Sequence, residues 1–132
     1  MRARWIGLAG AVLAAGCGSE GFPEPPDELL VSAAAIRNGE TTYRKNCSIC
    51  HGVRGHGDGP QARDLDPAPA DLANLSGVRA DPGYWFFRIK EGGKQEPLAR
   101  PRSAMPAWGE HLSDEEIWQV VAYQKVMIEG RT

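Results

Sequence analysis

Two cysteines and a histidine stand close together in the run Cys47-Ser48-Ile49-Cys50-His51. On one helical turn, thiols at this spacing lie on the same side of the chain. They are then placed to add across the two vinyl groups of one porphyrin, while the adjacent imidazole offers a nitrogen to the iron. This C-x-x-C-H pattern is the attachment signature of haem c. The sequence therefore predicts that Cys47 and Cys50 bind one covalent haem, with His51 as an axial ligand of its iron.

Three other chemistries use the same residue types. A dithiol redox motif needs a βαβ setting with a helix starting at the first cysteine, whereas here a helical pattern ends at the motif and a glycine-rich loop follows. A zinc site would combine Cys47, Cys50, His51 and His56. A disulfide between the two cysteines would close a small, strained loop. Haem attachment is favoured over these three alternatives.

Met105 is the predicted second axial ligand. It lies 54 residues after His51, in the segment SAMPAW, where Pro106 cannot continue a helix or strand. A methionine taken alone is most often core filler. A thioether on a rigid loop is nevertheless a suitable axial ligand. The iron–sulfur bond is weak, but the protein loop holds the sulfur in place. His/Met ligation also recurs in haem c proteins.

The competing ligands fit less well. Met1 belongs to the predicted export signal, and Met127 lies in an apolar helical stripe. His56 follows His51 by only five residues, too close to reach the opposite face of a haem easily. His111 immediately precedes a helix cap, so we expect it at the surface.

Three helical segments would position these residues. Residues 32–46 carry Ile36, Gly39 and Tyr43 on one face, and Gly39 in mid-helix suggests the close approach of another backbone. A second helix begins at Asp81-Pro82, with aspartate as N-cap, and stops at Gly92-Gly93. Its apolar residues that could cover a haem edge are Trp85, Phe86 and Ile89.

The last helix is the clearest. Ser113 and Glu116 form a capping box, and the helix is expected to end near Glu129-Gly130. Its inner face is predicted to comprise Ile117, Val120, Val121, Gln124 and Ile128, with Tyr123 at the border. No stretch alternates convincingly enough for a strand. We therefore predict an all-α domain over residues 32–132, with three main helices and irregular loops around one haem.

The N-terminus is predicted to be an export signal and an anchor. Residues 1–16 place two arginines before an apolar run of 11 residues and then small residues, in the order of a secretory signal. The run is far shorter than the roughly 20 residues of a transmembrane helix. The segment LAAGC resembles a bacterial lipobox, which predicts lipidation of Cys17; ordinary cleavage nearby would leave Cys17 a free thiol. Residues 17–31, rich in proline and glycine, are predicted to form a flexible tether.

Composition and charge exclude some functions. The chain of 132 residues has a formal charge of −2, which becomes −4 when residues 1–16 are removed with their two arginines. No basic run remains, so a nucleic-acid surface is not expected. With 42% hydrophobic and 24% charged residues, the composition is that of a globular domain. A domain of this size has a small core, which a haem would complete.

Residues 32–129 resemble a class I c-type cytochrome, monohaem and of bacterial lipoprotein type. The resemblance is carried by the C-x-x-C-H motif, the Met-Pro segment, Gly39 and Tyr43 before the first haem cysteine, and Tyr123 in the last helix. The string MPAWGEHLSDEEIWQVVAYQ is similar to the methionine loop and final helix of a bacterial subgroup. In this family the first and last helices cross at these positions.

The resemblance also implies a second set of site residues. In the family, a proline carbonyl before a leucine holds the other ring nitrogen of the axial histidine. The segment DPAPADL is the corresponding place, with Pro69 and Leu72 favoured and Pro67 as the alternative, since the spacing differs from familiar members. Such an acceptor would orient the imidazole and increase its donation to iron.

The function expected from these features is single-electron transfer on the periplasmic side of a bacterial envelope. The resemblance implies a quinol-oxidising complex upstream and a terminal oxidase or reductase downstream, with the lipid anchor holding the domain at a membrane. Two alternatives stay open: a haem subunit of a larger oxidoreductase complex, and a small haem peroxidase or sensor in which Met105 dissociates. A zinc or non-haem redox lipoprotein is a third.

Overall fold

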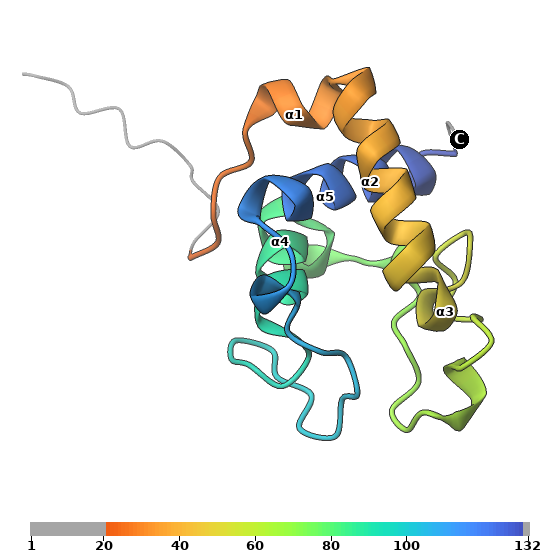
Figure 1. Ribbon diagram of the computed structural model, residues 1–132. Helices are drawn as coiled ribbons and strands as arrows, with labels where there is room; N and C mark the ends of the chain where they lie inside the picture. Colours follow the sequence, from red (N-terminus) through yellow and green to blue (C-terminus); the bar gives the residue numbers. More distant parts are fainter. Residues whose placement is uncertain (1–20, 131–132) are drawn as a thin grey trace, which may run out of the picture.

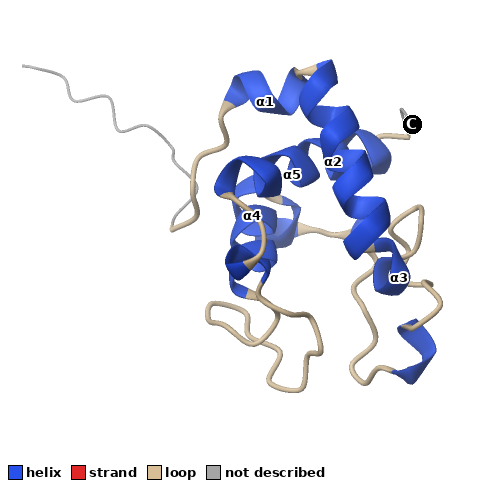
Figure 2. Cartoon of the chain, viewed as in Figure 1, coloured by secondary structure: helices blue, strands red, loops and turns tan. Residues whose placement is uncertain are grey.

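The computed structural model describes residues 21–130, which form an all-α domain (Figure 1). Residues 1–20, with the predicted export signal and Cys17, lie outside the described residues, as do residues 131–132. The described part has no strand, and short 3₁₀ turns interrupt its long loops (Figure 2). The α-helices are α1 (Asp27–Val31), α2 (Ala33–Asn46), α3 (Ser48–His51), α4 (Pro82–Glu91) and α5 (Asp114–Ile128). The predicted all-α fold with three main helices, α2, α4 and α5, is confirmed.

The first and last long helices, α2 and α5, cross at a glycine (Figure 1). A side chain on Gly39 would overlap the Gln119 carbonyl, so only a hydrogen at that position lets the two backbones meet. One helical turn further along α2, the Tyr43 ring packs on Tyr123 with 5.4 Å between centroids. Both tyrosines are almost wholly buried. The close approach predicted at Gly39 is therefore present, and it sets the position of the C-terminal end of α2.

The predicted caps begin both later helices. Asp81 accepts hydrogen bonds from the amides of Gly83 and Tyr84 at 2.7 and 3.2 Å, which starts α4. At α5, the Ser113 hydroxyl accepts from the Glu116 amide at 3.2 Å, and the Glu116 carboxylate accepts from the Ser113 amide at 2.8 Å. This reciprocal pair is the capping box. Local sequence alone therefore defines where these helices start.

The core lies between α2, α4 and α5. Phe86 of α4 stacks on Trp118 of α5, with ring centroids 4.3 Å apart and planes 20° apart. Ile117, Val120 and Val121 are fully buried below this pair. Of the residues predicted to cover a haem edge, Phe86 thus belongs to the core instead. Within residues 21–130, no helix has the length and apolar character needed to cross a membrane.

The tether predicted over residues 17–31 is corrected for the part from Phe22 to Val31. The Phe22 ring packs against Tyr84 and Phe87 of α4 at centroid distances of 5.3 and 5.5 Å. Residues 27–31 form α1, whose Leu29 and Leu30 pack against the core. Proline and glycine predicted extended chain here, but burial of these apolar side chains outweighs the cost of ordering it.

We expect Gly39→Ala to destabilise the domain. Alanine favours a helix by about 0.5–1 kcal/mol over glycine, but its methyl group would overlap the Gln119 carbonyl and force α2 and α5 apart. Such overpacking typically costs about 1–3 kcal/mol. Denaturant unfolding of the purified domain should show the net loss. The control is Asn38→Ala, at the exposed neighbouring position of α2; unchanged stability in both variants would contradict the close crossing.

Candidate functional site

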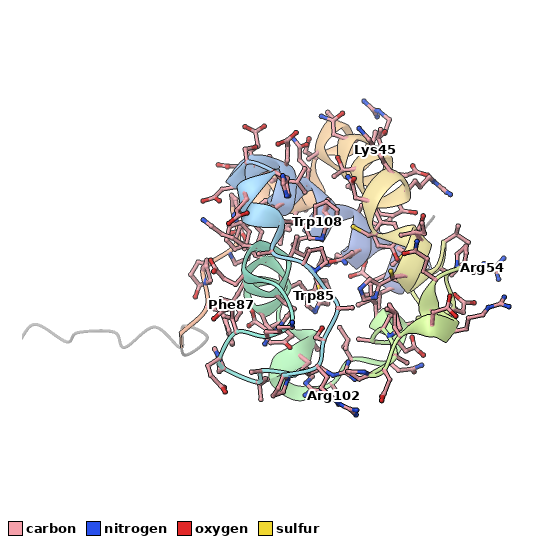
Figure 3. All side chains as sticks on the ribbon, turned by 60° about the horizontal axis from the view of Figure 1, so that its bottom comes forward. Lys45, Arg54, Trp85, Phe87, Arg102 and Trp108 are labelled. Carbon is pink, nitrogen blue, oxygen red and sulfur yellow. The ribbon has the colours of Figure 1, made fainter. Side chains whose placement is uncertain are left out.

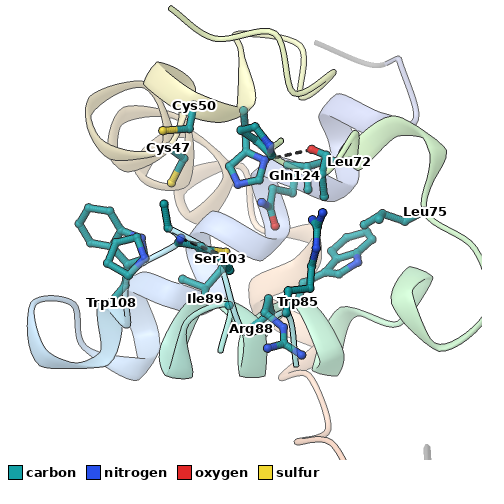
Figure 4. Close-up of a pocket in the computed structure, with 18 of the residues that line it drawn as sticks. Cys47, Cys50, Leu72, Leu75, Trp85, Arg88, Ile89, Ser103, Trp108 and Gln124 are labelled. Atoms are coloured by element: carbon teal, nitrogen blue, oxygen red, sulfur yellow. Dashed lines mark hydrogen bonds between the residues drawn. The ribbon is translucent and has the colours of Figure 1, made fainter. Parts of the chain in front are cut away.

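An apolar cavity opens between α3, α4, the C-terminal half of α5 and two loops (Figure 4). It brings together four of the predicted site residues, Cys47, Cys50, His51 and Met105, although Met105 is far from the others in sequence. One of the two loops spans residues 65–75 and supplies the wall near His51. The other spans residues 92–108 and carries Met105. Most of the lining is apolar, as a large flat hydrophobic ligand requires.

The two cysteines lie on one helical turn. Cys47 is the N-cap of α3, and its carbonyl accepts from the amides of Cys50 and His51 at 3.2 and 2.9 Å. Figure 4 shows the two sulfur atoms close together at one end of the cavity. The motif forms the separate short helix α3, and α2 ends just before it at Asn46, where the sequence pattern predicted the end of that helix. The predicted placement of both thiols on one side is present.

Three hydrogen bonds to backbone oxygens hold this turn against the rest of the domain. The buried Tyr43 hydroxyl donates to the Gly52 carbonyl at 2.8 Å. The Gly57 amide donates to the His51 carbonyl at 2.8 Å, and the Cys47 amide donates to the Tyr43 carbonyl at 2.8 Å. Gly52, with φ of 78°, ends α3 in a conformation that favours glycine. The α2–α5 crossing thus positions the turn that carries the two cysteines through Tyr43.

The His51 ring is oriented by a backbone carbonyl. Its Nδ1 lies 3.1 Å from the Ala70 oxygen, an acceptor, so Nδ1 carries the hydrogen and Nε2 keeps its lone pair. Burial lowers the pKa of His51, with the Ala70 carbonyl opposing that shift. A neutral imidazole with a free Nε2 is the form that binds a metal.

The predicted acceptor for His51 is corrected from Pro69 to Ala70. The Pro69 carbonyl faces the Cα of Gly57, so the following carbonyl turns toward His51. The Leu72 amide donates to the Gly55 carbonyl at 2.6 Å and holds the loop two residues beyond the acceptor. Pro67, Pro69 and Leu72 all line the cavity, as wall residues. The spacing of DPAPADL could not show which backbone carbonyl points toward His51. That direction depends on where this loop packs against Gly55 and Gly57.

Met105 is held by a pair of glycines. Its carbonyl accepts from the Gly93 amide at 3.1 Å, and its amide donates to the Ser103 hydroxyl at 3.2 Å. A Cβ on Gly93 would overlap Ser103, and one on Gly92 would lie 3.1 Å from the Met105 carbonyl oxygen. The Gly92-Gly93 pair that ends α4 therefore also lets the methionine loop pack closely against it.

Arginines connect the methionine loop to the loop that carries Ala70. Arg100 donates to the Ala68 carbonyl at 3.4 Å. Arg102 pairs with Asp66 at 3.0 Å, although both side chains are mostly exposed, so the pair adds little stability. Figure 3 shows Arg102 at the edge of the molecule, with Trp85 and Trp108 nearer its centre. The loops that supply the two walls thus meet each other directly.

The competing ligands lie elsewhere. His56 pairs with Asp71 at 3.4 Å and is about half exposed. His111 is exposed beside Trp108, as predicted. Met127 is buried in the core. Within residues 21–130, His51 and Met105 are the histidine and methionine that line the cavity.

The rival chemistries of the motif are not supported. Burial, followed by the neighbouring Cys50, raises the pKa of the Cys47 thiol to about 12, whereas dithiol redox motifs lower the pKa of the reactive cysteine. Both thiols are free, so they form no disulfide. In the described part of the chain, no group of three or more His, Cys, Asp or Glu side chains is placed to hold a metal ion. The zinc site with His56 is therefore wrong.

Sequence reasoning missed several residues of the cavity wall, among them Arg88 and Trp108. Arg88 of α4 donates to the carbonyls of Gly92, Gln95 and Pro97 at 2.9, 2.9 and 2.6 Å, so it holds the loop that follows its own helix. Trp108 closes the wall below the cysteines (Figure 4). Trp85 and Ile89, which the sequence did predict, line the same cavity. Arg88 lies four residues before the glycine pair that ends its helix, and this spacing was the available signal.

The residues present fit a covalently attached haem. Two adjacent thiols, a neutral imidazole with a free nitrogen and a thioether meet in one apolar cavity. Thiols suit thioether bonds to vinyl groups, while imidazole and thioether are the axial pair of cytochromes c. The donor set therefore agrees with the chemistry predicted from the motif.

Comparison with known proteins gives the family. Residues 34–123 match the family described as "Cytochrome C oxidase, cbb3-type, subunit III". The chain belongs to this cytochrome c family. It is also 32% identical to cytochrome c6 of Diacronema lutheri over 88 residues, which covers 67% of this chain and 90% of the relative.

Two solved structures are similar to the domain. One is a chain of the reducing HAO-like protein complex of Kuenenia stuttgartiensis, with a TM-score of 0.59 and 27% identity. The match covers 81% of this chain but only 47% of that one. The other is cytochrome cL of Methylophaga aminisulfidivorans MPT, with a TM-score of 0.48 and 22% identity, covering 89% of this chain and 75% of that one. The cytochrome domain is an electron carrier by its family membership, which implies covalent haem c.

Proposed function

We propose that this chain is a monohaem c-type cytochrome that passes single electrons between redox proteins at a bacterial membrane. When bound, the haem supplies one-electron chemistry between Fe(III) and Fe(II). The convergence of Cys47, Cys50, His51 and Met105 on one apolar cavity is the observation that carries this proposal.

Each of these residues has a distinct role in the proposal. Cys47 and Cys50 hold the group covalently, so it does not leave on a change of redox state. His51, whose ring the Ala70 carbonyl orients, and Met105, whose backbone Gly93 and Ser103 hold, would be the residues that bind the iron. If both residues bind the iron, they would leave no position open to a substrate. Methionine in place of a second histidine favours the reduced state and raises the potential.

Membrane attachment through Cys17 is part of the proposal. The lipobox-like segment before Cys17 supports it, and several acyl chains on one residue would give stable anchoring. The anchor would keep the domain on the periplasmic side, at high effective concentration near a quinol-oxidising complex and a terminal oxidase or reductase. Haem c is attached after export, so the export signal and the motif support each other.

A subunit of a larger oxidoreductase complex is the second candidate function. The matched family is described as an oxidase subunit, and the similar solved chain is part of a complex and has 47% of its length covered by the match. A haem peroxidase or sensor is disfavoured, because it requires an open iron position. Met105 is tied at both its amide and its carbonyl, and the alternative group His56 is turned away to Asp71.

Spectroscopy and one substitution test the ligand set. The mature protein, produced in a host that matures cytochromes, should show a low-spin haem c spectrum with a methionine-to-iron band. Met105→His should keep the haem, remove that band and lower the potential by well over a hundred millivolts, because imidazole stabilises Fe(III). The control, Met127→Leu in the core, should leave both unchanged. A colourless protein would overturn the proposal, and a high-spin wild type would favour the enzyme.

Cys17→Ser tests the anchor. Without the thiol there is no acylation, so the protein should move almost completely from the membrane fraction to the soluble periplasmic fraction. Ser19→Ala, two residues away, should remain with the membranes. Fractionation followed by haem staining gives the distribution of both variants. Retention of the Cys17→Ser protein at the membrane would show that lipidation is not what holds it.

A further inference from the structure

Gln124 is a polar residue on the buried face of α5. Only 6% of its surface is exposed, and its helical neighbours Val120 and Val121 are fully buried. The sequence pattern placed it on the inner face among aliphatic residues. An amide at such a position calls for an explanation, because buried polar groups are normally hydrogen-bonded.

The Gln124 amide faces the haem cavity. Within residues 21–130, no hydrogen bond joins it to another group. Among the described residues, every fully buried side-chain nitrogen or oxygen has a hydrogen-bond partner. Since the Gln124 amide has none, its atoms must keep some exposed surface. Gln124 lines the cavity, and Figure 4 shows its amide pointing into that space. Its remaining exposure is therefore to the cavity.

The other amide and hydroxyl groups of the wall are committed within the protein. Asn46 donates to the Thr42 carbonyl at 3.0 Å, and the Ser103 hydroxyl accepts from the Met105 amide. The Tyr84 hydroxyl accepts from Arg88 at 3.3 Å. Gln124 is thus the one amide or hydroxyl side chain of the described wall that has no hydrogen-bond partner in the protein.

The charged side chains of the cavity wall indicate what this amide would do to the reduction potential of a haem. The described lining contains Arg79, Arg88 and Arg100 but no carboxylate. Positive charge near a haem opposes its oxidation, since the oxidised form carries one more positive charge. A neutral dipole that can turn its oxygen toward the iron counteracts part of that effect, and side-chain amides do orient in the local field. In an apolar cavity such interactions are stronger than in water.

We propose that Gln124 is a residue that sets the reduction potential, with its amide stabilising the oxidised state from α5. The inference rests on the proposed haem in the cavity. Burying an amide without a partner costs about 1–3 kcal/mol of folding free energy, a penalty that leucine at this position would avoid. A role in setting the potential would explain why glutamine is present. The amide acts either directly or through a water held beside it, and both routes are lost with the side chain.

Gln124→Leu tests the proposal. The haem protein should form, keep its methionine-to-iron band and show a higher potential. At a fixed ambient potential, its oxidised-to-reduced ratio should fall several-fold relative to wild type in a spectroelectrochemical titration. Thermal unfolding is measured in parallel, because a purely structural glutamine would change stability and leave the potential unchanged.

Gln119→Leu is the matched control, the same change at a residue of α5 that does not line the cavity and whose amide donates to Glu115 at 3.2 Å. Its potential should equal that of wild type. An unchanged or lowered potential in Gln124→Leu would overturn the inference while leaving the haem assignment intact, whereas a wild-type protein without haem would overturn the proposed function itself. If the leucine variant fails to accumulate, Gln124→Asn withdraws the amide by one methylene and must also raise the potential.

Discussion

The close crossing of α2 and α5 at Gly39 is the constraint on which the rest of the molecule depends. With the Gln119 carbonyl packed where a side chain would otherwise lie, the two helices have a narrow choice of angle and register. The crossing brings Tyr43 onto Tyr123, and the Tyr43 hydroxyl then reaches Gly52 at the end of α3. The position of the turn that carries Cys47 and Cys50 therefore depends on a backbone contact in the core.

The same crossing places the far wall of the cavity. The C-terminal half of α5 presents Gln124 and Ile128 to the space beside His51, while α4 contributes Trp85 and Ile89. Because a small domain has few layers, one helix must serve both the core and the site. Val120 and Val121 face the core, and Gln124, within a turn of them, faces the cavity.

Loops determine how the residues of the site are positioned. Backbone groups support both residues: the Ala70 carbonyl orients the ring of His51, and the Gly93 amide holds the backbone of Met105. Glycines make each approach possible, since Gly57 faces the 69–70 carbonyls and Gly93 faces Ser103. Backbone groups make suitable supports here because they are neutral at every pH and cannot be withdrawn by a rotamer change.

The sequence by itself determined the proposed chemistry and the three main helices. The C-x-x-C-H spacing, the Met-Pro segment, the capping box at Ser113 and the aspartate cap at Asp81 are local signals, and each describes neighbours in the chain. Tertiary structure decided what depends on distant segments meeting: the Ala70 carbonyl instead of Pro69, the docking of Phe22 and α1, and the direction of the Gln124 amide. These features depend on how helices and loops that are distant in sequence pack against one another. The spacing of residues along the chain does not predict such packing.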